Sequence, residues 1–182
     1  MLHHIFLSDG YNLRNAIKHK NYPKIDWLTD ELTKKKEFDN VLNELCTLGD
    51  LDRLKTYIHK NNHFITDYES SINILCSNGH IECIKWVYNN ATILNNYDTI
   101  THIRGHFNIA CISGNIILAN WLYVFAFNHS IKLYDDVQQN NYLFECVCEN
   151  GHLHIIDWLL KISPGTNFSS VIISSFRFAC DN

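Results

Sequence analysis

Several features that would indicate a familiar class of protein are missing from this chain of 182 residues. It has no basic stripe, since 15 Lys and Arg stand against 19 Asp and Glu and the longest basic run is Lys34-Lys35-Lys36. A protein that binds nucleic acid by neutralising phosphates would show such a stripe, so we expect no nucleic-acid partner. The seven glycines are scattered, which excludes a glycine-rich phosphate loop.

Long apolar runs are missing too. The longest nearly apolar stretch, Ile116–Phe127, reaches about twelve residues, whereas a helix that crosses a bilayer needs about 20. Met1–Ser8 has too short an apolar stretch for a signal peptide, and no charged segment precedes it. Seven cysteines are an odd number for a disulfide framework. We therefore expect no membrane segment and an intracellular, reducing compartment.

What remains is the composition of a globular protein. Apolar residues make up 46 %, aromatic residues 13 % and charged residues 19 % of the chain, with a formal net charge of −4. These fractions exclude collagen-like and disordered chains, and the length fits one domain.

Four segments of the chain repeat one pattern around a glycine. The glycines are Gly49, Gly79, Gly114 and Gly151, which lie 30, 35 and 37 residues apart. Apolar residues stand seven and four positions before each glycine, a cysteine stands three before it, and apolar residues follow two, five and eight positions after it. These spacings predict one helix that ends at the glycine and a second helix that starts just after it.

The glycine itself is typical of a helix end, because it adopts the left-handed conformation without a steric penalty. Asp50 and Asn115 follow it directly and can cap the second helix, and His80 and His152 hold the same position less ideally. Each unit is then a pair of antiparallel helices too small to bury its own apolar face. Stacking against neighbours would cover that face. The prediction is an all-α helical solenoid of stacked helix-turn-helix repeats.

Both ends of the chain carry weaker copies of the pattern. Residues 13–28 fit it with Lys20 in the glycine position and Pro23 in the first turn of the second helix, where a missing N–H is tolerated. Residues 176–182 match the first helix of a further unit, with Cys180 in the cysteine position. We expect either a piece of a longer array, which we favour, or a truncated cap.

Two segments bring a family into view. Leu75–Trp86 (LCSNGHIECIKW) and then Val147–Trp158 (VCENGHLHIIDW) resemble the ankyrin repeat, whose period is about 33 residues. Tryptophan seven residues after the glycine, cysteine in place of alanine and the abundance of Asn, Ile and Tyr resemble the divergent ankyrin arrays of giant DNA viruses of amoebae. Dictyostelids or other AT-rich protists are the alternative source. The resemblance covers about residues 11–182.

The chain also departs from the family pattern. The Thr-Pro-Leu-His entry to the first helix and the Gly-Ala-Asp exit from the second are absent. We therefore expect irregular loops or short helical turns between repeats in place of β-hairpins. The predicted organisation is one ankyrin-like domain, 1–182, with a degenerate first repeat, four full repeats and either the start of a further repeat or a truncated cap: 11–39, 40–69, 70–104, 105–141, 142–173 and 174–182.

Five of the seven cysteines share the position three residues before the glycine. They are Cys46, Cys76, Cys111, Cys148 and Cys180. The family resembled here places a small buried alanine in that position, and free cysteine behaves as a small apolar residue, so we expect these thiols to pack in the core. Equivalent positions in successive repeats should lie about 10 Å apart, beyond the disulfide limit of about 7 Å between Cα atoms.

Two strings contain the residue types that bind zinc. They are Cys146-x-Cys148-x₃-His152-x-His154 and Cys76-x₃-His80-x₂-Cys83. The repeats of Cys46 and Cys111 lack such partners, so we favour packing over a metal site and expect no cofactor.

Catalysis finds little support in the sequence. A cysteine nucleophile needs exposure and a nearby histidine, whereas these cysteines belong to helix interiors. His102 and His106 flank Gly105 in what we interpret as a loop, and we expect them to be solvated. A centre built from buried cysteine and histidine, or from zinc, is the third interpretation, and we expect no enzymatic activity.

The four tryptophans stand seven residues after the glycine position of their units. They are Trp27, Trp86, Trp121 and Trp158. Such a row could stack single-stranded bases. A fixed offset on an apolar helix face favours packing between repeats instead.

In ankyrin repeats, partner contacts come from the two positions before the glycine and from loop tips on the concave side. The resemblance assigns that role to Thr47, Leu48, Ser77, Asn78, Ile112, Ser113, Glu149 and Asn150. Leu48 and Ile112 are apolar where the helix pattern does not require it, so each is either a partner anchor or a half-exposed scaffold residue. Tyr68, Tyr97 and Tyr134 in the predicted loops add a residue type that is enriched in interfaces.

These observations predict a non-enzymatic scaffold that binds another protein through the concave face and loop tips of the solenoid. Rigid helices would display the contact residues with little loss of entropy on binding. If the viral resemblance holds, the partner is a host protein met in the host cytoplasm. The alternative is an architectural component of a virus particle or another large assembly.

Overall fold

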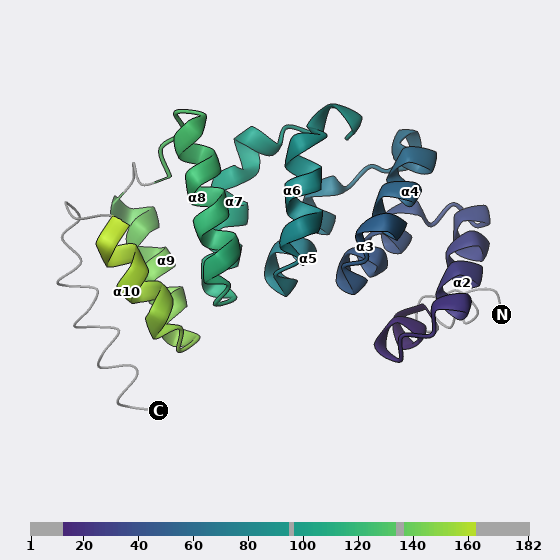
Figure 1. Cartoon of the computed structure of the whole chain (residues 1–182), viewed down its shortest axis with the longest axis horizontal. Coiled ribbons are helices and arrows are strands. Elements are labelled where there is room, and N and C mark those ends of the chain that lie inside the picture. The colour runs from purple at the N-terminus through teal and green to yellow at the C-terminus, as the bar shows by residue number, and fades with distance from the viewer. Residues whose placement is uncertain (1–12, 95–96, 134–136, 163–182) are drawn as a thin grey trace. The chain divides into compact units, whose positions relative to one another are not determined.

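The computed structural model describes residues 13–94, 97–133 and 137–162, and every regular element in these ranges is helical (Figure 1). The all-α prediction is therefore confirmed. Residues 13–18 are helical as well. The other elements are α2 (Tyr22–Lys34), α3 (Phe38–Leu48), α4 (Leu51–Asn61), η1 (Asn62–Phe64), α5 (Tyr68–Asn78), α6 (Ile81–Asn89), η2 (Ala91–Ile93), α7 (Thr99–Ile112), α8 (Ile116–Asn128), α9 (Val137–Glu149) and α10 (Leu153–Ile162).

The helices occur in the predicted pairs. Helix α3 packs on α4, α7 on α8 and α9 on α10, and α5 and α6 are joined by the same kind of turn. Contacts also join successive pairs, since α2 packs on α3 and α7 packs on α9. The first helix of each pair begins upstream of the predicted repeat boundary, and the boundary between residues 104 and 105 falls inside α7.

The core is made of the positions that the repeat pattern marks as apolar. Leu42, Ile72, Phe107 and Phe144, seven residues before the glycines, are at most 2 % exposed. The residues four before the glycines are buried to the same degree: Leu45, Leu75, Ala110 and Val147. Because positions −7 and −4 share one helix face, each first helix turns a continuous apolar stripe inward.

The degenerate first repeat follows the same plan. Lys20, in the glycine position, has a left-handed φ of 50°. Asn21 Oδ1 accepts a hydrogen bond from the Lys24 N–H at 3.3 Å, and Pro23 lies in the first turn of α2. The pattern therefore located this turn correctly although its glycine is absent.

The connections between pairs contain short 3₁₀ turns, and the described residues contain no strand, as expected from the missing family motifs. One connection is fixed by Asp39, in the first turn of α3. Its carboxylate accepts hydrogen bonds from the Thr66 N–H at 2.8 Å, the Thr66 hydroxyl at 2.6 Å and the Asp67 N–H at 3.2 Å. Asp67 in turn caps α5, because its Oδ1 accepts from the Ser70 N–H at 2.9 Å.

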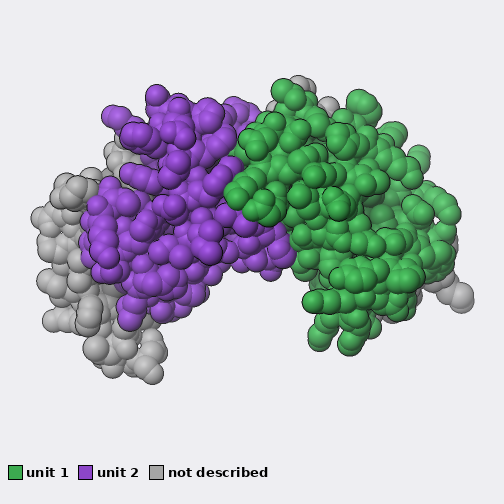
Figure 2. Space-filling model, in the orientation of Figure 1, with its two compact units in different colours: residues 1–75, 82–97 green, residues 76–81, 98–182 purple. Residues whose placement is uncertain are grey.

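The chain divides into two compact units (Figure 2). Unit 1 comprises the residues up to Leu75 together with Glu82–Tyr97. Unit 2 comprises Cys76–Ile81 and the residues from Asp98 onward. The predicted segment 174–182, with Cys180, lies outside the described residues.

Candidate functional site

Four of the turns between paired helices are built on a glycine in the left-handed region. Gly49, Gly79, Gly114 and Gly151 have φ values of 71°, 71°, 73° and 73°. A residue with a side chain pays about 1–2 kcal/mol in that conformation, whereas glycine does not. The predicted role of these four glycines is confirmed, and each one fixes where the first helix of its pair stops.

The residue after the glycine caps the second helix in two of these turns. Asp50 Oδ1 accepts a hydrogen bond from the Arg53 N–H at 3.2 Å, and Asn115 Oδ1 accepts one from the Leu118 N–H at 3.1 Å. Both predicted caps are confirmed. In these two turns the cap ties the first turn of the second helix to the residue after the glycine.

In unit 2, the turns at Gly114 and Gly151 each rest directly on the turn before them. A Cβ added to Gly79 would lie 1.8 Å from Asn115 Nδ2, and one added to Gly114 would lie 2.6 Å from the ring of His152. The His154 Nε2 atom lies 2.9 Å from the carbonyl oxygen of Gly114. The three turns of unit 2 therefore form a contiguous row, in which Gly79 and Gly114 are needed for close approach as well as for their φ.

The predicted partner residues lie in the last turns of the first helices or directly after them, beside this row. Six of them belong to unit 2, and we call them the turn surface: Ser77, Asn78, Ile112, Ser113, Glu149 and Asn150. All are exposed except Ile112 and Ser113, which are half-buried. Thr47 and Leu48 hold the same positions in unit 1, where the first is exposed and the second half-buried.

The turn surface offers hydrogen-bonding groups and little charge. It carries the hydroxyls of two serines, the amides of two asparagines, one aliphatic side chain and a single carboxylate, that of Glu149. The Asn150 amide donates a hydrogen bond to the carbonyl of Cys146 at 2.8 Å, which holds its side chain against α9. The chemistry available here is recognition by shape and by neutral hydrogen bonds.

One of the three predicted loop tyrosines, Tyr68, lies in a helix and is buried. Tyr68 is the first residue of α5 and is only 4 % exposed, because it packs near Tyr97 with 6.4 Å between ring centroids. Burial raises the pKa of Tyr68 to about 12. Its role in packing is therefore a correction to the loop interpretation. Tyr97 is half-buried, and Tyr134 lies outside the described residues.

Three of the four described cysteines in the shared position pack in the core. Cys46, Cys76 and Cys111 are at most 1 % exposed, whereas Cys148 is half-buried. Burial raises the pKa of Cys76 to about 12 and raises the pKa values of Cys46 and Cys111 as well. A thiol that stays protonated at neutral pH is a poor nucleophile and a poor metal ligand.

The two zinc-like strings do not converge on a metal site in the described ranges, which contain no group of three His, Cys, Asp or Glu side chains suited to a metal ion. Cys83 is buried, and its Sγ donates to the carbonyl of Gly49 at 3.4 Å. The rings of His152 and His154 lie 5.9 Å apart, edge to face, and both are held against the turn at Gly114. These side chains connect neighbouring turns.

The two histidines around Gly105 were misinterpreted as loop residues. They lie inside α7, whose N-cap Asp98 accepts from the Ile100 N–H at 2.9 Å. His106 is fully buried, and burial, with a smaller contribution from the charge of His102, lowers its pKa to about 4. The glycine suggested a break, but an isolated glycine in a helix costs only about 1 kcal/mol, and the apolar residues around it outweigh that cost.

Tryptophan packing between repeats is confirmed for two of the four residues. Trp86 contacts His59 of the preceding pair at 5.9 Å between ring centroids. Trp158 lies 6.1 Å from Phe107 and 5.9 Å from Tyr123, both in the preceding pair. Trp121 is half-buried, and its ring lies tilted against that of Phe125 in its own helix, with 5.3 Å between centroids.

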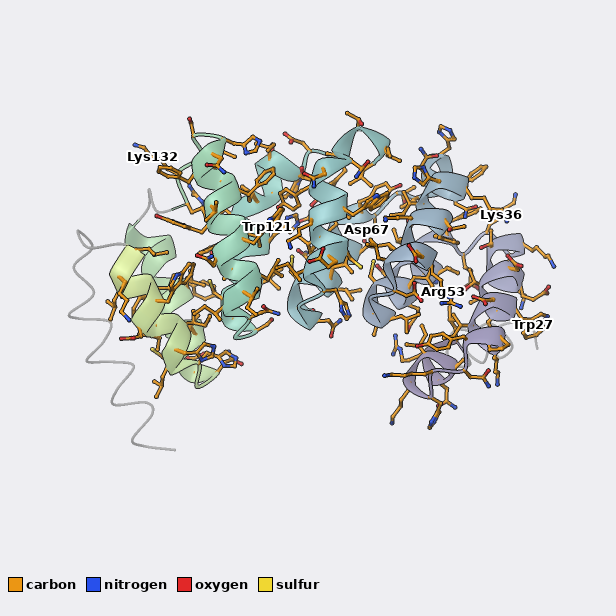
Figure 3. The ribbon with its side chains drawn as sticks, viewed as in Figure 1. Trp27, Lys36, Arg53, Asp67, Trp121 and Lys132 are labelled. Atoms are coloured by element: carbon orange, nitrogen blue, oxygen red, sulfur yellow. The ribbon has the colours of Figure 1, made fainter. Side chains whose placement is uncertain are left out.

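Trp27 contradicts the packing prediction. Its side chain is 60 % exposed at the surface of α2 (Figure 3). The tryptophan at this offset packs toward the preceding helix pair, and the part of the chain that the structure describes contains no pair before α2.

Sequence reasoning missed a pocket of about 400 Å³ in unit 1, formed where α2, α3 and α4 meet. Arg53 lies at its wall and pairs with Asp26 at 2.8 Å and with Asp50 (Figure 3). The Tyr57 hydroxyl donates to the carbonyl of Phe38 at 3.2 Å. The lining contains neither cysteine nor histidine. No signal in the sequence could have located it, because it depends on the packing of helices from two repeats.

Comparison with family models, curated proteins and solved structures finds no match to this chain. Among the described residues, no helix combines the length and apolar character that crossing a membrane requires. The ankyrin resemblance therefore continues to depend on the residues of the repeat and on the helix pairs that they form.

Proposed function

We propose that this chain is a non-enzymatic protein-interaction scaffold built as an ankyrin-like solenoid, and that it binds a partner protein through the turn surface. The observation that carries the proposal is the stacked row of turns in unit 2. Successive turns touch each other through Asn115 and His152, so the variable residues beside them are held at fixed spacing. Pre-organised contact residues lose little entropy on binding, which is the physical advantage of such a scaffold.

The side chains of the turn surface support this choice over catalysis. Serine hydroxyls and asparagine amides can donate and accept hydrogen bonds, and the half-buried Ile112 supplies an apolar contact at the middle turn. The repeated scaffold positions next to them are buried and uniform, whereas these positions differ from turn to turn. A protein partner of neutral, hydrogen-bonding character fits such a surface. If the viral resemblance holds, that partner is a host protein.

The proposal is tested by quantitative affinity capture with three forms of the full chain. In the test variant, Ser77→Arg and Glu149→Arg place two long cations on exposed positions of the turn surface. In the control variant, Asn89→Arg and Asp157→Arg make the same change of charge at exposed positions of α6 and α10. We expect proteins captured by the wild type and the control to be lost from the test variant. Equal recovery of every protein by all three forms would overturn the assignment.

A further inference from the structure

One helix breaks a rule that the second helices of the other three glycine turns obey. Three, six and ten residues after the glycine, α4, α6 and α10 hold polar residues. They are Asp52, Lys55 and His59 in α4, Glu82, Lys85 and Asn89 in α6, and His154, Asp157 and Lys161 in α10. In α8 the same three positions hold Ile117, Asn120 and Val124.

These apolar side chains are exposed to solvent. Ile117 is 69 % exposed, Val124 is 45 % exposed, and Phe127, one turn further on, is 73 % exposed. The other face of α8 is buried against α7 through Leu118 and Leu122. Helix α8 is thus apolar on both sides, which is the composition of a helix with partners on both sides. We call Ile117, Asn120, Val124 and Phe127 the α8 outer face.

The α8 outer face runs as a stripe along the helix. Its residues follow one another at intervals of three, four and three, so they lie on one side of α8. A stripe of this shape fits a second helix packed alongside the first.

The absence of charge on α8 favours a second copy of the same chain as the source of the covering helix. Residues 116–128 contain no Asp, Glu, Lys or Arg, so two copies of this surface meet without like-charge repulsion. The amide of Asn120 both donates and accepts, so it can pair with its own copy across a two-fold axis, as isologous interfaces require. We propose that the α8 outer face is the interface of a homodimer in which α8 packs against α8 of a second copy.

The exposed area limits the size of this dimer interface. The three apolar side chains expose on the order of 300–400 Å² on each copy, which is a large patch for a monomer but half of a standard interface. An interface of this size belongs with small, transient contacts, so the dimer is sought at micromolar protein concentrations.

Sedimentation equilibrium of the full chain across the micromolar concentration range tests the proposal. The test variant carries Ile117→Glu and Asn120→Lys, which copies onto α8 the Glu82–Lys85 ion pair that α6 holds at the same positions, at 2.8 Å. The control variant, Leu153→Glu, removes an apolar side chain that is 69 % exposed on α10. Phe127→Lys is a second, single-site variant of the α8 outer face, and far-UV circular dichroism checks that all variants fold.

We expect the wild type and Leu153→Glu to show the same monomer–dimer equilibrium. Both variants of the α8 outer face should weaken it at least tenfold. A wild type that stays monomeric throughout the range would overturn the proposal, since the surface would then await a different partner. The proposal also fails if the α8 variants dimerise like the wild type, or if Leu153→Glu weakens association equally, which would indicate nonspecific apolar contact.

Discussion

At the scale of single residues, the turn glycines have two roles that substitution can separate. Gly151 has a φ of 73° and open space around a Cβ, so Gly151→Ala should cost only the conformational penalty, about 1–2 kcal/mol. In Gly79→Ala the new Cβ would also collide with the side-chain amide of Asn115. Moving that amide would disturb the cap of α8. We expect Gly79→Ala to cost about 1 kcal/mol more than Gly151→Ala in urea unfolding.

The contact between Gly79 and the Asn115 amide can be tested separately from the φ of Gly79. In an Asn115→Ala background the amide that a Cβ would strike is gone, so the extra cost of Gly79→Ala should disappear and leave only the penalty for its φ. Equal costs for Gly79→Ala and Gly151→Ala in the wild-type background would show that the turns tolerate a side chain between them.

Gly105 differs from the turn glycines because no conformational need explains it. It lies in the middle of α7, is exposed, and has no atom within 4 Å of the position that a Cβ would occupy. Glycine in a helix interior is about 1 kcal/mol less favourable than alanine. Gly105→Ala should therefore raise the free energy of unfolding by about that amount, measured in urea. A loss of stability would mean that the backbone of α7 needs the glycine.

His106 should make the free energy of unfolding depend on pH. Its pKa is about 4 when folded and has the ordinary value of 6.5 when unfolded, so between these values the unfolded chain binds a proton that the folded chain does not. The full stability is present above pH 6.5 and is lost as the pH falls toward 4. We expect this residue alone to lower the free energy of unfolding by about 2 kcal/mol between pH 8 and pH 5.

The comparison with His106→Leu isolates that effect from the other titrating groups. The leucine variant cannot bind the proton, so its unfolding free energy should fall less over the same pH range. Parallel pH profiles for the two proteins would contradict the assignment of His106 as a buried neutral imidazole.

At the scale of helices and turns, the features that depend on local side-chain chemistry could be predicted from the sequence. Helix pairs, glycine turns and the caps Asp50 and Asn115 follow from spacing and side-chain type, and the structure has them. The predictions that failed concern positions whose environment is set by packing against other elements. Tyr68 was predicted to lie in a loop, but it is buried near Tyr97, and Trp27 was assigned to packing between repeats although no described pair precedes its helix. The pocket beside Arg53 belongs to no single repeat, so no repeat pattern could predict it.

Asp39 links α3 to the connection that leads into α5. It accepts hydrogen bonds from both backbone N–H groups at 66 and 67 and from the Thr66 hydroxyl. Asp39→Ala leaves these donors without their charged acceptor and should cost about 2 kcal/mol, with faster hydrogen exchange at the amides of Thr66 and Asp67. Asp52→Ala, which also removes an acid from a first helical turn, should cost less than about 1 kcal/mol and leave that exchange unchanged. Unchanged exchange in Asp39→Ala would show that another contact holds the connection.

At the scale of the whole molecule, the cysteines report on the two units separately. Cys46 and Cys83 lie in unit 1, whereas Cys76 and Cys111 lie in unit 2. All four are buried, and burial raises their pKa values, to about 11 for Cys83 and about 12 for Cys76. At pH 8 they should react with a thiol reagent only when the surrounding structure opens, because both access and the thiolate are missing in the closed state.

This dependence on opening makes Asp39→Ala a test of how the repeats share their stability. In a protein made of repeats, each repeat interacts mainly with its neighbours, so a destabilised repeat can open without the rest. We expect Asp39→Ala to accelerate the labelling of Cys46 and Cys83, measured by mass spectrometry of the alkylated protein, about tenfold or more. The labelling of Cys76 and Cys111 should change much less. Equal acceleration of all four thiols would mean that the described chain opens as one cooperative block, and the two compact units would then have no separate stability.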